Sequence, residues 1–188
     1  MEAKNDIKMP YLLQGLASQI SLSFSNVSNI SHDYESFIEM EGNSLFCEDF
    51  NVAATKGIIF KITDANVFIK NSKMFRNLEY DSNLLTDFLI TSDMNEIFNV
   101  TFIDNDFSID LGFSIKIMNI YSVFILNCNF LGYDNGKGVE LYDVEHCMIE
   151  NSSFVLLTNL ENGGGALFFS CFPNSKLISF ISILNCTF

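Results

Sequence analysis

The chain has 188 residues, of which 48% are hydrophobic, so it is long enough to bury a core as one domain and is not a disordered tail. Its 10 Lys and Arg against 23 Asp and Glu give a formal net charge of -13, which repels phosphate backbones and anionic lipid. We therefore expect no nucleic-acid partner and interpret the charge as a way to keep a hydrophobic chain in solution.

Residues 1–19 lack the basic block followed by an apolar block that marks a secretory signal. We interpret them as an N-terminal cap or irregular segment. Residues 20–188 are interpreted as a repeat region that stops in the middle of a repeat, so we expect it to be truncated or to continue beyond residue 188. No stretch reaches the roughly 18 apolar residues of a membrane span, so no direct span is predicted in this segment.

One short pattern recurs along the chain: an aliphatic residue, any residue, Asn, any two residues, then Phe. An early copy has Cys in the Asn place, and one later copy has Met in the Phe place. From Cys47 to Asn185 the successive copies are 24, 28, 28, 24 and 34 residues apart, a range typical of solenoid coils. The copies begin at Leu45, Ile69, Ile97, Ile125, Ile149 and Ile183.

Apolar residues alternate before each Asn, as at Val123 and Ile125, and a second alternating run lies about ten residues earlier, as in 113–117. Period two with β-branched residues predicts strands. The connections are too short for crossover helices, so successive coils must stack in parallel about 4.8 Å apart. The predicted fold is all-β, a right-handed parallel β-helix solenoid of about six to seven coils, since parallel crossovers are nearly always right-handed.

A leucine-rich repeat is the alternative fold, because it has a similar period and an Asn or Cys at a strand end. It asks for a Leu-dominated pattern and often a helical back face. Here Ile and Phe dominate and the return segments alternate with period two. These features favour the β-helix.

The Asn of the pattern has the same parity as the inward aliphatic residues, so we predict that its amide points inward and bonds to the Asn of the next coil. The Phe three residues later is predicted to turn into the interior and stack on its equivalents. The predicted structural ladder is Cys47, Asn71, Asn99, Asn127, Asn151 and Asn185. The predicted core stack is Phe50, Met74, Phe102, Phe130, Phe154 and Phe188.

Two further motifs occur together: Phe-x-x-Asn at 68–71, 102–105 and 124–127, and Gly-Gly-Ala-Leu at 164–167. In combination they resemble the polymorphic outer-membrane protein repeat family, over roughly residues 68–167. The resemblance implies a right-handed β-helix belonging to a surface-displayed adhesin or autotransporter. Only part of the repeat signature is present, because Gly-Gly-Ala occurs once, and fold transfers along such a resemblance better than function.

Parallel β-helices also host polysaccharide lyases and glycoside hydrolases, so a carbohydrate-active enzyme is an alternative function. A glycosidase needs two carboxylates held at a fixed separation, and a lyase needs a basic residue, for which the single Arg76 is a poor source. We interpret the candidate carboxylates as solvated turn residues and predict no catalytic residue. The candidates are Asp104, Asp106, Asp110, Asp134, Glu140 and Glu145.

No metal site and no cofactor are predicted. The run from Asp104 to Asp110 has the spacing of the start of a calcium loop, but Ile115 stands where a bidentate Glu belongs. His32 and His146 lie far apart, and neither has a Cys at ligand spacing. The cysteines are odd in number and lack Cys-x-x-Cys spacing, so we expect mostly small buried hydrophobes rather than a zinc site or a complete disulfide framework. They are Cys47, Cys128, Cys147, Cys171 and Cys186.

Five Asn-x-Ser/Thr sequons make the chain a glycoprotein candidate. Asn26 and Asn29 are the favoured acceptors. The others are Asn99, Asn151 and Asn185, which belong to the predicted inward ladder and so could not carry a glycan.

Taken together, the sequence predicts a non-enzymatic structural or adhesin-like element of a surface or extracellular protein or filament. The expected partners are proteins, or other copies through the solenoid ends, with glycans or a host or cell surface as further candidates. The expected location is extracellular or on the cell surface. An intracellular scaffold in a larger assembly is the other alternative, since it fits the missing signal and free thiols.

Overall fold

The computed structural model describes residues 13–16, 19–30, 36–54, 58–76, 86–93, 97–157, 165–171 and 180–188. All regular secondary structure in these ranges is β-strand, and they contain no helix able to cross a membrane. The strands form one 16-stranded sheet in which every pairing between strands is parallel. The chain is therefore a parallel β-solenoid, which confirms the predicted fold class over the leucine-rich repeat.

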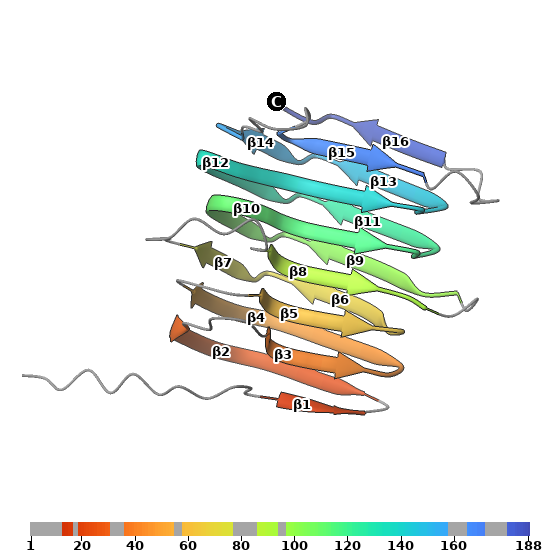
Figure 1. The fold of residues 1–188 in the computed structure, drawn as a ribbon. Coiled ribbons are helices and arrows are strands. Elements are labelled where there is room, and N and C mark those ends of the chain that lie inside the picture. The colour runs from red at the N-terminus through yellow and green to blue at the C-terminus, as the bar shows by residue number, and fades with distance from the viewer. Residues whose placement is uncertain are drawn as a thin grey trace, which may run out of the picture.

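The strands follow one another as rungs, from β1 and β2 at one end of the stack to β15 and β16 at the other (Figure 1). They are β1 Leu13–Leu16, β2 Ile20–Ile30, β3 Ser36–Glu41, β4 Ser44–Ala54, β5 Ile58–Thr63, β6 Asn66–Lys70, β7 Lys73–Arg76, β8 Thr86–Thr91, β9 Asn99–Ile103, β10 Asp106–Met118, β11 Ser122–Leu126, β12 Asn129–Tyr142, β13 His146–Glu150, β14 Ser153–Val155, β15 Leu167–Ser170 and β16 Phe180–Leu184.

The solenoid makes about five turns, slightly fewer than the six to seven coils predicted. β1 pairs in register with β3. The solenoid therefore extends into the segment 1–19 that the sequence marks as a cap or irregular segment, and residues 1–12 lie outside the described ranges. The right hand of the helix stays a prediction.

Each coil contributes strands to three faces. The first face contains β1, β3, β5, β8, the second halves of β10 and β12, and β15. The second face contains the first halves of β2 and β4, then β6, β9, β11, β13 and β16. The third face contains the second halves of β2 and β4, then β7, the first halves of β10 and β12, and β14.

Side chains alternate inward and outward along the strands, as predicted, and the inward ones fill the interior. In β11 the side chains of Val123 and Ile125 are fully buried, whereas Phe124 and Leu126 point outward and are partly exposed. The same alternation recurs in β6 and β13. Burying these aliphatic and aromatic side chains is the main stabilising contribution to the fold.

A column of near-parallel phenylalanine rings runs through the interior behind the third face. The ring centroids of Phe107 and Phe130 are 4.8 Å apart, those of Phe130 and Phe154 are 4.7 Å apart, and those of Phe154 and Phe188 are 5.3 Å apart. Met74 precedes Phe107 in the same register. The predicted stack is thus confirmed for its last three phenylalanines.

Two predicted members of that stack lie elsewhere. Phe102 pairs with Ile69 and Ile125 in the aliphatic place of the repeat, where it is fully buried. Phe50 is also buried, but it packs edge-on against Phe60, with ring centroids 5.7 Å apart, rather than in the column.

Two copies of the repeat are therefore out of register in the sequence alignment. The copy beginning at Phe102 has Asp104 in the Asn place, and the copy beginning at Cys47 has Asp49 there. Ile97, taken as the start of a copy, lies before β9 and is 65% exposed. The predicted register is wrong for these two coils because Asp occupies the Asn place, and Phe or Cys occupies the aliphatic place.

Candidate functional site

The corner between the second and third faces is built around a residue with a left-handed backbone. From β4 onward this residue is Asn or Asp in each described coil, and its φ lies between 48° and 56°. Asn and Asp tolerate this conformation better than other non-glycine residues. We call these residues the outer corner row: Asp49, Asn71, Asp104, Asn127, Asn151 and Asn185.

The outer corner row corrects the predicted inward ladder. Asn71, Asn127, Asn151 and Asn185 are in the predicted register but are exposed, because the left-handed residue turns the chain and reverses the inward–outward alternation. Cys47 and Asn99 are not members of this row: Cys47 is a buried side chain of β4, and Asn99 is the exposed first residue of β9.

Bonds between coils do run along the outer corner row, as the ladder hypothesis required. The backbone N–H of Asn71 donates to the carbonyl of Ile103 at 3.0 Å, and equivalent bonds follow in the next coils. Asn127 Nδ2 donates to Asp104 Oδ1 at 3.1 Å, and Asn71 donates to Asp49 in the same way. The amide ladder therefore exists, but on the outside of the corner.

The buried ladder is formed by the residue that follows each outer corner residue from Asn71 onward, whereas the residue that follows Asp49 is the apolar Phe50. We call it the inner corner row: Ser72, Asn105, Cys128, Ser152 and Cys186. The first four are at most 1% exposed, and Cys186 is partly exposed. The sequence signal for this row is a small polar residue or Cys directly after the Asn or Asp of each coil from Asn71 onward, which a pattern centred on Asn does not contain.

Side chains of the inner corner row accept backbone N–H groups from the preceding coil. Ser72 Oγ accepts from Phe50 N at 3.1 Å, and Asn105 Oδ1 accepts from Ser72 N at 2.8 Å. Ser152 Oγ accepts from Cys128 N at 3.1 Å. Buried N–H groups without partners are costly, so this row allows each corner to close inside an apolar core.

The same side chains donate back to carbonyls near the corner. Ser72 Oγ donates to Lys70 O at 2.9 Å, and Asn105 Nδ2 donates to Ile69 O at 3.0 Å. Cys128 Sγ donates to Leu126 O at 3.3 Å. Ser72, Asn105 and Ser152 are thus held from both sides, and the inner corner row joins consecutive coils.

The cysteines form no disulfide. Burial raises the pKa of the Cys47, Cys128 and Cys147 thiols to about 12, so these groups stay protonated at neutral pH and behave as the small buried hydrophobes predicted. Cys171 is exposed and Cys186 is partly exposed. The prediction that most of the cysteines are buried is therefore confirmed, and the two that are not buried lie at the C-terminal end of the stack.

The outer faces carry rows of polar side chains that bond along the solenoid axis. On the first face Lys61 Nζ lies 2.6 Å from Glu39 Oε1. On the third face Asn129 Nδ2 donates to Asp106 Oδ1 at 2.9 Å and accepts from Ser153 Oγ at 2.7 Å. Such exposed contacts are individually weak, but they set the register of neighbouring coils.

The four candidate carboxylates whose side chains the structure describes lie at separate places on the solenoid. Asp104 belongs to the outer corner row, and Asp106 lies on the third face, 3.2 Å from Lys73 Nζ. The run that resembled a calcium loop is not a loop, because β10 begins at Asp106. In the described part of the chain, no three His, Cys, Asp or Glu side chains gather as a metal-binding group.

The remaining candidates are spread over other parts of the solenoid. Glu140 lies on the first face, where it contacts Lys116 at 2.9 Å and accepts a 2.7 Å bond from the Tyr142 hydroxyl. Burial, together with Glu140, raises the pKa of Tyr142 to about 12. Glu145 precedes β13 and lies 3.6 Å from His146. The side chains of Asp110 and Asp134, and all of His32, lie outside the described part of the structure.

The sequons are distributed differently from the prediction. Asn26 is exposed on the third face and accepts a bond from Asn51 Nδ2 at 2.8 Å. The side chain of Asn29 lies outside the described residues. The remaining three sequon asparagines, predicted to point inward, are all exposed, so the steric argument against glycans on them is wrong. They are Asn99, Asn151 and Asn185.

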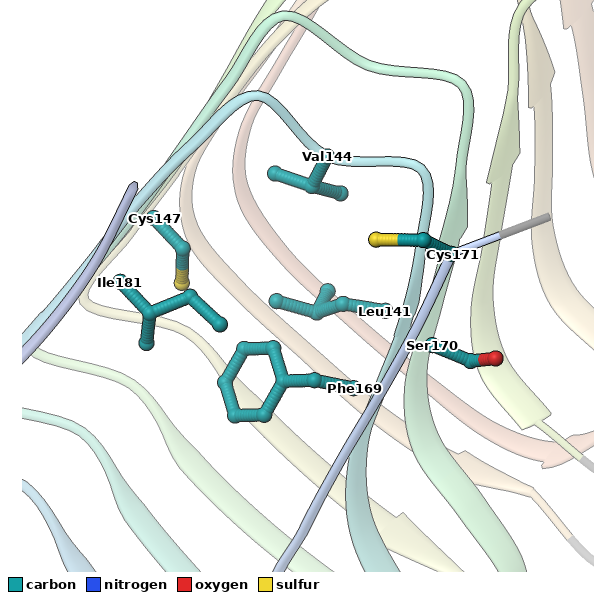
Figure 2. Close-up of a pocket in the computed structure, with 7 residues that line it drawn as sticks. All are labelled: Leu141, Val144, Cys147, Phe169, Ser170, Cys171 and Ile181. Atoms are coloured by element: carbon teal, nitrogen blue, oxygen red, sulfur yellow. The ribbon is translucent and has the colours of Figure 1, made fainter. Parts of the chain in front are cut away.

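A cavity of about 110 Å³ opens at the C-terminal end of the core (Figure 2). It is mostly apolar, and it is smaller than the roughly 300 Å³ at which ligand pockets usually begin. Its lining comes from β12, β13, β15, β16 and adjacent turns: Leu141, Val144, Cys147, Phe169, Ser170, Cys171 and Ile181.

Comparison with known proteins gives no family model, curated protein or solved structure that matches this chain. The resemblance to the polymorphic outer-membrane protein repeats stays a prediction. Its Phe-x-x-Asn copies are not equivalent in space: Phe68 and Phe124 point outward, whereas Phe102 points inward.

The Gly-Gly-Ala segment has a clear structural role where it is described. The backbone N–H of Gly138 donates to the carbonyl of Gly165 at 2.9 Å, and Val139 N donates to Ala166 O at 2.9 Å. A Cβ on Gly138 would lie 2.3 Å from Ala166 O, so the close approach of these two segments requires glycine there.

Proposed function

We propose that the chain is a non-enzymatic structural or adhesive β-solenoid element of a surface or extracellular protein or filament. The observation that carries this proposal is the continuity of bonding along the axis. Backbone pairing, the inner corner row and the phenylalanine column all join each coil to the next. A stack held in this way resists bending, and its faces offer long regular surfaces to partners.

The placement of the acidic side chains supports the same proposal. Asp104, Asp106 and Glu140 each contact a side chain of a neighbouring coil, so these carboxylates help to hold the register. They lie on one corner and two different faces. A glycoside hydrolase would instead need two carboxylates opposed across a bound sugar.

The test against the enzyme alternative is a product assay. The full chain would be incubated with acidic and neutral polysaccharides, and reducing ends and unsaturated sugars would be measured over time. We expect no product above the rate without protein. Product formation that Glu140→Gln or Asp106→Asn abolishes, while both variants stay folded, would establish a carbohydrate-active enzyme and overturn the proposal.

The proposed surface location has a separate test. Intact-mass and glycopeptide mass spectrometry on protein from its native source would report glycan on Asn26 and count the reduced thiols. Glycan on Asn26 supports the surface proposal, because that side chain is exposed on the third face. A bare mass with five reduced thiols would overturn it in favour of an intracellular scaffold.

A further inference from the structure

We propose that the second face of the solenoid pairs side by side with the second face of another copy of this chain, with the two solenoid axes parallel and a two-fold axis running along them. This inference rests on the proposed structural function and names the partner of that element. The residues concerned are the outward side chains of β4, β6, β9, β11 and β13, whose strands follow one another along one side of the stack (Figure 1).

Large apolar side chains point outward along the middle of the second face. One outward residue from each strand pairs in register with the next and is partly exposed. We call this row the outward stripe: Phe46, Phe68, Thr101, Phe124 and Met148. The rings of Phe46 and Phe68 are parallel, with centroids 5.1 Å apart. The outward stripe is therefore an ordered aromatic and apolar surface on the outside of the sheet.

The other two faces carry more polar rows. The central outward row of the first face is Glu39, Lys61, Leu89, Lys116 and Glu140, and its charges pair along the row. The third face has the row Asn51, Lys73, Asp106, Asn129 and Ser153, next to a mixed row that contains Phe75 and Ser108. Among the described outward rows, the outward stripe thus holds the most large apolar side chains, which is the composition of an interface core.

The charge of the second face indicates what its occupant must be. The stripe itself carries no charge, and beside it Lys70 Nζ lies 3.3 Å from Glu48 Oε1, so these two charges balance within the chain. A strongly charged partner would therefore gain little here. The chain has a net charge of -13, so two copies repel each other wherever acidic surfaces meet. The fitting occupant is an apolar surface of low charge, and the described surface with that chemistry is the same face of a second copy.

The rows that flank the outward stripe select the orientation of the pair. A two-fold axis along the solenoid places each stripe residue on its own equivalent and places one flank on the other. The flank toward the outer corner row is Glu48, Lys70, Ile103, Leu126 and Glu150, and it then faces Ser44, Asn66, Asn99, Ser122 and His146 of the second copy. Glu150 thus faces His146, Ile103 extends the apolar contact, and no like charges meet.

The alternative two-fold axis, along the strands through Thr101, is unfavourable. It would place Glu48 on Glu150, so that two carboxylates meet. It would also place Lys70 on Leu126, which buries a charge against an apolar side chain. The parallel arrangement avoids both costs.

The size of the face sets the strength of the pairing. With coils about 4.8 Å apart and residues about 3.3 Å apart along each strand, these rows extend about 24 Å by 13 Å, or roughly 300 Å² per copy in projection. A standard stable interface buries roughly 800 Å² per partner. We therefore expect a monomer–dimer equilibrium that depends on concentration.

The first test places a charge in the outward stripe. Phe124→Glu should raise the dissociation constant of the dimer by about tenfold or more, and Phe68→Glu should do the same from another coil. Leu131→Glu is the matched control, because Leu131 is also outward and partly exposed but lies on the third face, and it should change the dissociation constant by less than about twofold. Circular dichroism and thermal melting confirm folding, and sedimentation velocity over a concentration series measures the equilibrium.

The second test measures the orientation. Met148→Cys and Phe46→Cys are made in a Cys171→Ser, Cys186→Ser background, because the other three cysteines are buried. With a short bismaleimide, Met148→Cys should cross-link to its own equivalent across the pair. Cross-linking that occurs only in a mixture of Met148→Cys with Phe46→Cys would overturn the parallel orientation.

Salt separates this pairing from binding of a basic partner. Because both copies are acidic, raising the salt concentration should tighten the pairing, whereas contacts between opposite charges weaken. Weaker pairing in salt would contradict an apolar contact between two copies. So would a chain that is monomeric at its highest attainable concentration, or equal losses in Phe124→Glu and Leu131→Glu.

Asn99 separates the fate of the pairing from that of the proposed function. Asn99 is exposed on the flank of the outward stripe, and a glycan on it would cover the stripe. Glycan found on Asn99 in protein from its native source would therefore overturn the pairing while supporting the proposed surface location. Glycan cleavage by the chain would overturn the proposed function whatever the assembly state.

Discussion

The middle coils and the last described coil carry the same residues in the same register but bury them differently. Ile149 in β13 is fully buried, whereas Ile183, its partner in β16, is 41% exposed. The strand pattern directs both side chains inward, and the coils above and below determine how far each is removed from water. Stability in such a stack is therefore expected to be a sum of contacts between neighbouring coils, largest where a coil has two neighbours.

Substitution of equivalent phenylalanines is expected to give the largest contrast between the two regions. Phe130 is 1% exposed between two stacked rings, and Phe130→Ala should lower the free energy of unfolding by about 3–5 kcal/mol. Phe188 is 69% exposed, and Phe188→Ala should cost less than about 1 kcal/mol. Urea unfolding in dilute solution measures both, and equal losses would show that the last coil is covered as well as the middle ones.

The inner corner row in the middle coils should give the next largest effect. Asn105→Leu keeps the volume but removes the acceptor for Ser72 N–H inside the core, at a cost of about 1–3 kcal/mol in unfolding free energy. Asn129→Leu is the control, because Asn129 is exposed on the third face, and its substitution should change the unfolding free energy by about 0.5 kcal/mol or less. A loss no larger than the control's would mean that water or another group satisfies the corner.

The direction of side chains within strands could be predicted from the sequence, and the corners could not. Val123 and Ile125 are inward as their alternation indicates. Asn127 shares their parity but points outward, because its left-handed backbone restarts the alternation and sends Cys128 inward instead. A period-two pattern contains no signal for this reversal. Phe130 is inward again, which is why most of the predicted core stack is right although the predicted ladder is wrong.

The register errors have a second physical cause. The outer corner position selects for backbone conformation, and Asp meets that requirement as well as Asn. A pattern that requires Asn therefore excludes Asp49 and Asp104, which have the left-handed backbone, and includes Asn99, which does not. The residues of the inner corner row, such as Ser72 and Asn105, differ in type from coil to coil. Their shared role is therefore visible only from their hydrogen bonds.

Substitutions in the outer corner row distinguish the free-energy cost of a left-handed backbone from the cost of lost side-chain packing. Asn127→Ala places a β-carbon residue at φ 54° and should lower the unfolding free energy by about 1–2 kcal/mol, whereas Asn127→Gly should be close to neutral. Asn185→Ala has the same backbone cost in the last coil, but we expect that coil to open locally, so the effect on global unfolding should be smaller. Hydrogen exchange of the amides of β16 distinguishes local from global opening, and an equally large global effect at Asn185 would contradict the comparison.

Surface ion pairs should have the smallest effect, even in the middle coils. Lys61 Nζ lies 2.6 Å from Glu39, with side chains 45% and 26% exposed, so the coupling energy in a double-mutant cycle of Lys61→Met and Glu39→Gln should be below about 1 kcal/mol. Since salt screens exposed charges, the coupling should approach zero in about 1 M salt. A coupling above about 2 kcal/mol that persists in salt would contradict this expectation. It would mean that the faces, and not only the buried columns, contribute to the greater stability expected of the middle coils.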